Sequence, residues 1–202
     1  MDNLILTAFG PFGEHKINSS TVCLNEIKSK WNLNTFGVNL ITYEIPVIYE
    51  DTNEIIHKLW DRHKPKLIAH LGVSGLADEI TLEKCAFNGP YTQCDINGKI
   101  PKSYCCLSDY SQDAQFQTEI DLDLLCNTIK LENDSNILNK ISISNHPGKY
   151  LCGYSYFCSL SINPARVLFI HIPVINKKYS VDEITQALII IFTTLLKQID
   201  ES

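Results

Sequence analysis

The chain has 202 residues and a formal net charge of −6, with 45% hydrophobic and 20% charged residues. This composition is typical of a globular protein, and the length favours one domain spanning residues 1–202. The acidic balance argues against non-specific binding to nucleic acid, which requires a basic surface. The sequence contains no apolar run of the roughly 20 residues that a membrane helix needs, and its first residues do not resemble a signal peptide. We therefore expect a soluble, cytoplasmic protein that binds neither nucleic acid nor membrane.

Short apolar runs alternate with amphipathic segments along the chain. In chain order, the predicted elements are a strand at 4–9, a helix at 19–31, a strand at 38–47, a helix at 52–63, a strand at 66–73, a weaker strand at 80–87, a loop at 89–98, a helix at 121–130, a strand at 137–143, a helix at 150–160, a strand at 167–172 and a helix at 181–196. Ser19 or Ser20 is expected to cap the first helix, and Ser180 the last. This alternation indicates an α/β fold with a mostly parallel sheet covered by helices on both faces.

Eight cysteines occur, at positions 23, 85, 94, 105, 106, 126, 152 and 158. A disulfide framework is disfavoured because the chain is long and hydrophobic and shows no secretion signal. A structural zinc site is also disfavoured, since Cys105 and Cys106 are adjacent and no Cys-x-x-Cys pair occurs. Most of the cysteines are expected to be small buried hydrophobic side chains. The sequence predicts no metal and no cofactor.

Cys152 has the most distinctive surroundings of the eight. It follows a loop that contains Pro147 and Gly148, and it begins an apolar, helix-compatible segment. A thiol at the start of a helix feels the positive end of the helix dipole, which favours the thiolate. Cys152 is therefore a candidate nucleophile, although a buried structural thiol remains the alternative for any one cysteine.

His171 interrupts the apolar strand predicted at 167–172. A histidine in such a strand is either a core residue bonded to the backbone or a functional group. One helix and one turn separate it from Cys152, so the two residues can meet at one edge of the sheet as a nucleophile and its base. From the residues alone, the chain is an α/β domain with a candidate Cys–His hydrolase site.

Glu83 is the candidate third member of such a site. It lies in the weaker strand and would accept a hydrogen bond from the imidazole. Taken alone, Glu83 is better interpreted as a solvated strand residue, and the residues themselves give little reason to prefer it over Asp78 or Glu79. Phe9 and Phe12 flank a Gly-Pro pair after the first strand, where they are either lids of the core or walls of a pocket.

Three segments together resemble the pyroglutamyl-peptidase I family. The first is LTAFGPFG at 6–13, followed by NSS at 18–20; the second is GVSG at 72–75 with ITLEKCAFN at 80–88; the third is SN at 144–145 and GKYLC at 148–152, with FIHIP at 169–173. The segments occur in the order and at the spacing of the family, so the resemblance covers nearly the whole chain. It implies a three-layer α/β/α sandwich with a mostly parallel, mixed central sheet.

The resemblance also implies an activity, that of a cysteine omega-peptidase acting on peptides with an N-terminal pyroglutamate. Cys152 would be the nucleophile, His171 the acid and base, and Glu83 the group that orients the imidazole. The backbone N–H of Cys152 would serve as an oxyanion donor. Four further residues would bind the pyroglutamyl ring, namely Phe9, Phe12, Tyr150 and Leu151. Members of the family occur as monomers and as homo-oligomers.

One departure from the family pattern concerns the loop after the second segment. The family often has an arginine there that assists at the oxyanion, whereas residues 93–98 contain none and Asp95 falls near that place. This departure motivates one alternative, a catalytically impaired homologue that binds peptide ends or partners. A second alternative, which rests on the set of eight cysteines, is a metal or redox protein.

Overall fold

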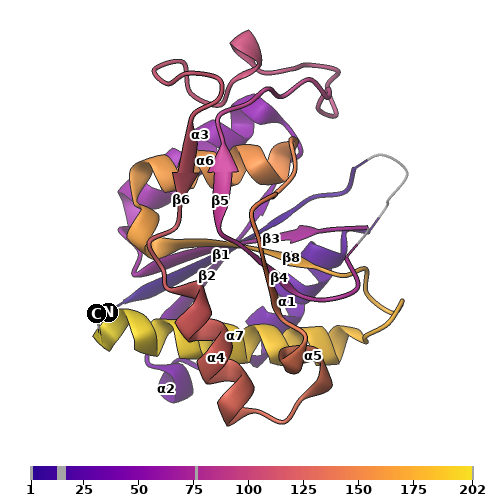
Figure 1. Ribbon diagram of the computed structural model, residues 1–202, viewed down its shortest axis with the longest axis vertical. Coiled ribbons are helices and arrows are strands. Elements are labelled where there is room, and N and C mark those ends of the chain that lie inside the picture. Colours follow the sequence, from indigo (N-terminus) through magenta and orange to yellow (C-terminus); the bar gives the residue numbers. More distant parts are fainter. Residues whose placement is uncertain (1, 13–16, 76, 202) are drawn as a thin grey trace.

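The computed structural model describes residues 2–12, 17–75 and 77–201 (Figure 1). Gly13, the last residue of the first family segment, lies outside the described residues. The strands are β1 (Asn3–Phe9), β2 (Asn39–Ile45), β3 (Leu67–Val73), β4 (Thr81–Glu83), β5 (Cys85–Phe87), β6 (Gln115–Gln117), β7 (Ser142–Ser144) and β8 (Val167–Ile172). The helices are α1 (Ser19–Lys30), α2 (Leu33–Phe36), α3 (Tyr49–His63), α4 (Leu122–Glu132), α5 (Asn136–Asn139), α6 (Leu151–Ile162) and α7 (Val181–Glu201), with short 3-10 turns at Lys102–Tyr104 and Pro164–Arg166.

The central sheet has the strand order β2-β1-β3-β8-β4-β7. From β2 to β8 neighbouring strands are parallel, whereas β4 runs antiparallel to β8 and parallel to β7. A second, small sheet pairs β5 with β6 in antiparallel register. The fold class predicted from the sequence, an α/β sandwich with a mostly parallel, mixed sheet, is confirmed.

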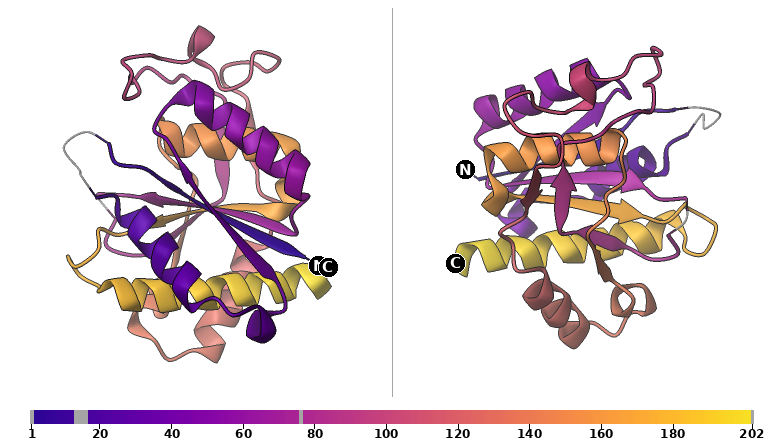
Figure 2. Two further views of the ribbon diagram at one scale, coloured as in Figure 1. Left: turned by 180° about the vertical axis from the view of Figure 1, so that it is seen from behind. Right: turned by 45° about the horizontal axis from the view of Figure 1, so that its top comes forward.

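Helices cover both faces of the central sheet. Figures 1 and 2 show α3 and α6 side by side on one face, and α1, α4, α5 and α7 on the other. The strands explain why both faces need a cover: in β1, Leu4, Leu6 and Ala8 point into one core cluster, and Ile5 and Phe9 into the other. A strand buried on both faces reads as a continuous apolar run, as the sequence of β1 does. None of the helices in the described part is long and apolar enough to cross a lipid bilayer.

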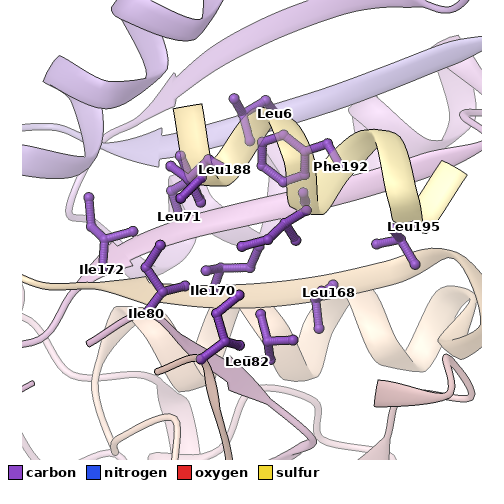
Figure 3. Close-up of a cluster of buried hydrophobic side chains, with 14 of the residues drawn as sticks. Leu6, Leu71, Ile80, Leu82, Leu168, Ile170, Ile172, Leu188, Phe192 and Leu195 are labelled. Atoms are coloured by element: carbon purple, nitrogen blue, oxygen red, sulfur yellow. The ribbon is translucent and has the colours of Figure 1, made fainter. Parts of the chain in front are cut away.

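The larger core cluster lies between the sheet and α7. Figure 3 shows Leu6 and Leu71 of the sheet against Leu188, Phe192 and Leu195 of the helix, all of them buried. The apolar face of α7 repeats at helical spacing, so burying it on the strands fixes the helix against the sheet.

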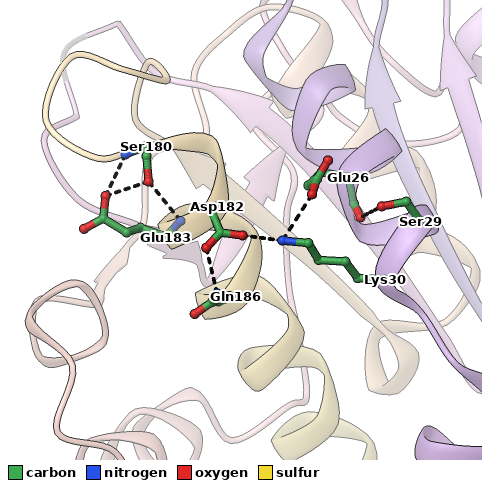
Figure 4. A network of polar contacts seen from close by, with 7 residues as sticks. All are labelled: Glu26, Ser29, Lys30, Ser180, Asp182, Glu183 and Gln186. Carbon is green, nitrogen blue, oxygen red and sulfur yellow. Dashed lines mark hydrogen bonds and ion pairs between the residues drawn. The ribbon is translucent and has the colours of Figure 1, made fainter.

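Polar contacts hold the start of α7 against α1 (Figure 4). Ser180 and Glu183 form a capping box, in which the Ser180 N–H donates to Glu183 Oε2 (2.8 Å) and the Glu183 N–H donates to Ser180 Oγ (3.2 Å). The predicted cap at Ser180 is therefore confirmed. Lys30 pairs with Glu26 on its own helix and with Asp182 on α7.

His70 is a fully buried core residue. Its Nδ1 lies 2.7 Å from Thr7 Oγ1 on β1, and its Nε2 lies 2.7 Å from Ser159 Oγ on α6. The Ser159 hydroxyl also accepts a hydrogen bond from Trp60 Nε1 of α3, at 3.2 Å. Burial lowers the pKa of His70 to about 3, so the ring is neutral and acts as a polar link between the sheet and these two helices.

Three details differ from the sequence prediction. The segment at 80–87 does not form one strand, because the chain leaves the central sheet at Lys84 and continues as β5 in the small sheet. The strand predicted at 137–143 is instead the short helix α5 followed by β7, since its apolar residues Ile137 and Leu138 are buried from a helix. The cap of α1 is Asn18 rather than Ser19 or Ser20, and its Oδ1 accepts from the Ser20 N–H at 3.0 Å.

Candidate active site

Glu83 and His171 meet across the antiparallel pair of β4 and β8. Glu83 lies opposite Phe169 in this pair, so His171, two residues further along the same face, is its diagonal neighbour. Nδ1 of His171 lies 2.7 Å from Oε1 of Glu83. The other oxygen, Oε2, is buried and has no hydrogen-bond partner among the described residues. The contact fixes the imidazole plane and leaves Nε2 to face the opposite side.

The backbone at Glu83 is held in place from α6. The hydroxyl of Tyr156, which is fully buried, donates to the Glu83 carbonyl oxygen at 2.8 Å. The helix that carries Cys152 and the strand that carries Glu83 are thus joined directly. This bond couples the position of the carboxylate to that of the thiol.

Cys152 is the second residue of α6, and its thiol lies above β3 beside His171. A Cβ added at Gly72 would come within 3.0 Å of Cys152 Sγ and 2.7 Å of Phe169 Cζ. Gly72 is also the register partner of His171 in the pairing of β3 with β8. The absence of a side chain at Gly72 therefore makes the room in which the thiol reaches the imidazole.

The imidazole of His171 interacts with both Cys152 and Glu83. Burial on its own would lower the pKa of His171, but its hydrogen bonds with Cys152 and Glu83 outweigh burial and raise the pKa to about 9. Only 8% of His171 is exposed, and only 2% of Glu83. At neutral pH the histidine is therefore protonated between a thiol and a buried carboxylate.

The first turn of α6 presents backbone amides beside the thiol. The first intrahelical bond at this end runs from the Tyr154 N–H to the Tyr150 carbonyl, at 3.0 Å. The amides before it, including that of Cys152, lie outside the helical bonding pattern. The Gly148 carbonyl packs on Gly153, where an added Cβ would stand 2.1 Å from the oxygen. Glycine at 153 thus allows the preceding loop to lie against the start of the helix.

A small pocket of about 40 Å³ opens beside the thiol. It is lined by Phe9, Phe12, Asn18, Val47, Val73, Tyr150, Leu151 and Cys152. It lies at the carboxyl ends of β1, β2 and β3, where the α/β pattern predicts a site. The four residues expected to bind a pyroglutamyl ring are all among its lining residues, none of which is acidic.

Phe9 has both of the roles that the sequence left open, since it covers the core and also forms a wall of the pocket. It is buried in the core cluster beneath α3 and α6, with its ring centroid 6.5 Å from that of Phe169, and it also lines the pocket. Asn18 was not singled out as a pocket residue, yet it contributes an amide to the pocket wall. Its Nδ2 donates to the Gly10 carbonyl at 3.1 Å, which fixes the loop after β1. An asparagine just before a helix was the signal for its capping role.

Comparison with known proteins decides the family. Residues 2–176 match the family model of pyroglutamyl peptidase PgaPase_1. Over 199 residues the chain is 36% identical to pyroglutamyl-peptidase 1 of Homo sapiens, covering 98% of this chain and 92% of the human protein. The chain belongs to the pyroglutamyl-peptidase I family. As a member of this peptidase family, it is a hydrolase.

Two solved structures from the pyroglutamyl-peptidase I family share the fold. A mutant pyrrolidone carboxyl peptidase of the hyperthermophile Pyrococcus furiosus superposes with a TM-score of 0.82 at 20% identity, covering 96% of this chain and 98% of the other. Pyroglutamyl peptidase I of Bacillus amyloliquefaciens gives a TM-score of 0.80 at 22% identity, covering 98% of each chain. The chain thus has the same fold as these two peptidases.

Asp95, which the resemblance to the family sets near an arginine position, uses its carboxylate to hold its own loop. Oδ2 accepts from the Tyr49 N–H at the start of α3, at 3.2 Å. Oδ1 accepts from the N–H groups of Asn97 and Lys99, at 2.9 and 3.0 Å. Because α3 has no capping side chain of its own at Ile48, Asp95 supplies the cap from the loop and binds the loop to the helix.

The two arginines of the chain lie elsewhere. Arg62 is in the last turn of α3, shortly before β3, and Arg166 directly precedes β8. Both are thus at the amino ends of the strands, whereas Cys152 lies at the carboxyl ends. Within the described ranges, no arginine reaches the candidate site. The backbone N–H groups at the start of α6 are therefore the donors that the site offers to an oxyanion.

Proposed function

We propose that this chain, acting as a single catalytic domain over residues 1–202, hydrolyses the amide bond that follows an N-terminal pyroglutamyl residue. Cys152 is the nucleophile, His171 the acid and base, and Glu83 the orienting carboxylate. The observation that carries the proposal is the thiol–imidazole–carboxylate array at the mouth of a pocket without an acidic side chain, in a member of this family.

The chemistry of the pocket supports a neutral substrate end. Pyroglutamate is a lactam without an α-ammonium group, so it gains nothing from the carboxylate that an ordinary aminopeptidase uses. A flat ring fits between apolar and aromatic walls such as Phe9, Phe12, Tyr150 and Leu151, with few polar contacts. Asn18 is a further wall residue, and of its two amide N–H groups one donates to the Gly10 carbonyl and the second can donate to the lactam.

The proposed reaction begins from a thiolate and an imidazolium. A protonated His171 stabilises the thiolate of Cys152, as does the start of α6. The thiolate attacks the pyroglutamyl carbonyl, and the developing oxyanion accepts from the Cys152 N–H. His171 then donates its proton to the leaving amine, and a thioacyl-enzyme remains. The neutral imidazole activates a water molecule, which releases pyroglutamate and restores the ion pair.

Glu83 serves this sequence as an orienting group. Its Oε1 is 2.7 Å from Nδ1 of His171, so Nε2 is directed to the thiol and then to the leaving amine. The buried carboxylate also stabilises the imidazolium at each stage in which it is charged. We further propose that the protein works in a reducing compartment such as the cytoplasm, because the reaction requires Cys152 to be a free thiol, as it is in this structure.

The test is hydrolysis of a fluorogenic pyroglutamyl amide by the purified, reduced protein, with the corresponding prolyl amide as a matched substrate that lacks the lactam carbonyl. We expect turnover of the pyroglutamyl amide alone, and none by Cys152→Ala. If a folded and fully reduced wild-type protein bound a pyroglutamyl peptide without turnover, the chain would instead be a binding homologue.

A further inference from the structure

A second cluster of thiols and imidazole lies outside the active site. It joins Cys106, in the segment between β5 and β6, to Cys158 of α6 and His57 of α3. Sγ of Cys106 donates to the carbonyl oxygen of Tyr154, one helical turn before Cys158, at 3.4 Å. The side chains of Cys106 and Cys158 interact with each other, and His57 interacts with Cys158. Neither cysteine takes part in the reaction proposed above.

The two thiols of the cluster are buried, whereas His57 is exposed on the surface of α3. Cys158 is fully buried and Cys106 is 7% exposed. Cys106 forms part of the wall of a cavity of about 350 Å³, which is large enough for a small molecule. Lys99 and Lys102 also line this cavity, together with the carboxylates of Glu50 and Asp95, so its wall carries charges of both signs. A reagent in the cavity can reach Cys105 and Cys106, which both line it, whereas Cys158 does not line it.

The surroundings of the two thiols shift their pKa values in opposite directions. The hydrogen bond with Cys106 lowers the pKa of Cys158 to about 6 despite burial, and His57 contributes in the same direction. Burial and the neighbouring Cys158 raise the pKa of Cys106. Contacts with Cys106 and His57 thus stabilise the thiolate form of Cys158, and the contact with Cys158 in turn raises the pKa of His57.

We propose that Cys106 and Cys158 form a thiol-oxidation site, which becomes an intramolecular disulfide by exchange with a low-molecular-weight disulfide that enters the cavity at Cys106. The sulfur of Cys106 attacks one sulfur of the reagent RSSR, passes its proton to Cys158 and releases RS⁻, which takes a proton from His57. Cys158 then gives its proton to His57 and attacks Sγ of Cys106, which releases a second RS⁻ that is protonated by His57. Two protein thiols are oxidised, one RSSR is reduced, and two RSH molecules leave.

The disulfide would tie a substrate-side loop to the catalytic helix. The segment between β5 and β6 also contains Cys94, whose carbonyl accepts from the Tyr150 hydroxyl at 3.2 Å, beside the substrate pocket. In Figures 1 and 2 this segment extends past α3 and α6. Joining Cys106 to Cys158 would restrain this segment on α6, the helix that carries Cys152 six residues before Cys158.

The experiment uses the full chain with Cys105→Ser as background. This neighbouring thiol donates to the Ser103 carbonyl at 3.2 Å, outside the cluster. Its removal leaves Cys106 as the only cysteine between Cys94 and Cys126. The protein is incubated with oxidised glutathione, denatured, alkylated with iodoacetamide and digested without reduction, and its peptides are identified by mass spectrometry. We expect a peptide cross-linked through Cys106 and Cys158, and the loss of that cross-link in Cys158→Thr and in Cys106→Ser.

Several results would overturn the proposal. One is that Cys106 and Cys158 are both found labelled by iodoacetamide, and so still reduced, at a concentration of oxidised glutathione that fully modifies Cys152. Another is a cross-link between either cysteine and a different partner, or separate glutathione adducts on both. Circular dichroism of Cys158→Thr and Cys106→Ser before oxidation shows that the variants are folded. If either is not, urea unfolding of the background protein gives an independent test: the oxidised form must unfold at a higher urea concentration than the reduced form, and an unchanged midpoint contradicts the cross-link.

Discussion

Oε1 of Glu83 lies 2.7 Å from Nδ1 of His171, although 88 positions separate the two residues in the sequence. The contact exists because β4 is the strand that runs antiparallel to its neighbour β8, which makes the two residues diagonal partners on one face. The direction of this one strand therefore brings the carboxylate to the imidazole.

Glu83→Gln tests that relationship. The amide keeps the volume of the carboxylate but removes its charge, so the imidazolium is less stable and its orientation is no longer fixed. We expect kcat/KM for the pyroglutamyl amide to fall by about 10²- to 10⁴-fold, mainly in kcat. Glu79→Gln is the matched control, and it should leave kcat/KM within about twofold. Equal losses in the two variants would remove Glu83 from the site.

Gly72→Ala tests the room in which the thiol reaches the imidazole. The added methyl group would lie within 3.0 Å of both Cys152 Sγ and the Phe169 ring. We expect the free energy of unfolding to fall by about 1–3 kcal/mol, and turnover to fall more than tenfold because the thiol is displaced. Gly75→Ala is the control, since an added Cβ there meets nothing within 4 Å. Full activity in Gly72→Ala would contradict this placement of the thiol.

The pH dependence of turnover follows from His171. Its pKa of about 9 means that the proton needed by the leaving amine is lost only in alkaline solution. We expect kcat/KM to decline on the alkaline side with a midpoint near that value, rather than near the usual histidine value of about 6.5. A profile that is already declining around neutrality would show that Cys152 and Glu83 do not hold the proton on the imidazole.

Stability should follow the same group. The folded-state pKa of His171 is above that of a free histidine, so protonation favours the folded state. This contribution is complete below about pH 6.5 and is lost as the pH rises through about 9. Urea unfolding at a series of pH values should show a decline in the free energy of unfolding across this window. The decline should be smaller in Cys152→Ala, where one of the two groups that raise the pKa is missing.

Asp95→Ala tests the role of the loop at residues 93–98. The change removes the acceptor of three backbone N–H groups and the cap of α3, so we expect a loss of about 1–2 kcal/mol in the free energy of unfolding. Because the same loop accepts from Tyr150 at the pocket, KM should rise more than kcat falls. Asp109→Ala, an exposed carboxylate in the same segment, is the control. A drop in kcat alone would indicate that Asp95 acts in the chemistry itself.

The fold was predictable from the sequence wherever the residues of an element specify its secondary structure without distant contacts. β1 and β8 are continuous apolar runs, and α7 has a helical apolar face with its capping box at Ser180, so all three were placed correctly. The split at Lys84 and the helix at 136–139 depend on which distant segments pair, which a short apolar run does not specify. The cap of α3 comes from Asp95, 46 residues beyond Tyr49, so it could not be predicted from the helix sequence.

The site, like the fold, has residues that the sequence alone indicates and features that depend on distant contacts. Cys152 after its loop and His171 in its apolar strand stand out as residues, whereas Glu83 could not be separated from Asp78 or Glu79 without the resemblance to the family. The space at Gly72 could not be foreseen either, because it arises from a thiol, a ring and a strand that meet only in the fold. The pairing of Cys106 with Cys158 likewise requires the loop between β5 and β6 to return to α6.

The most direct test of the catalytic assignment is to trap the thioacyl-enzyme. The reduced protein is mixed with excess pyroglutamyl amide, quenched in acid within the first turnovers, and examined by intact-mass and peptide mass spectrometry. We predict a mass increase of one pyroglutamyl group on the peptide that contains Cys152, with no adduct and no turnover in Cys152→Ala. An adduct on another cysteine, or continued release of pyroglutamate by Cys152→Ala, would contradict the assignment.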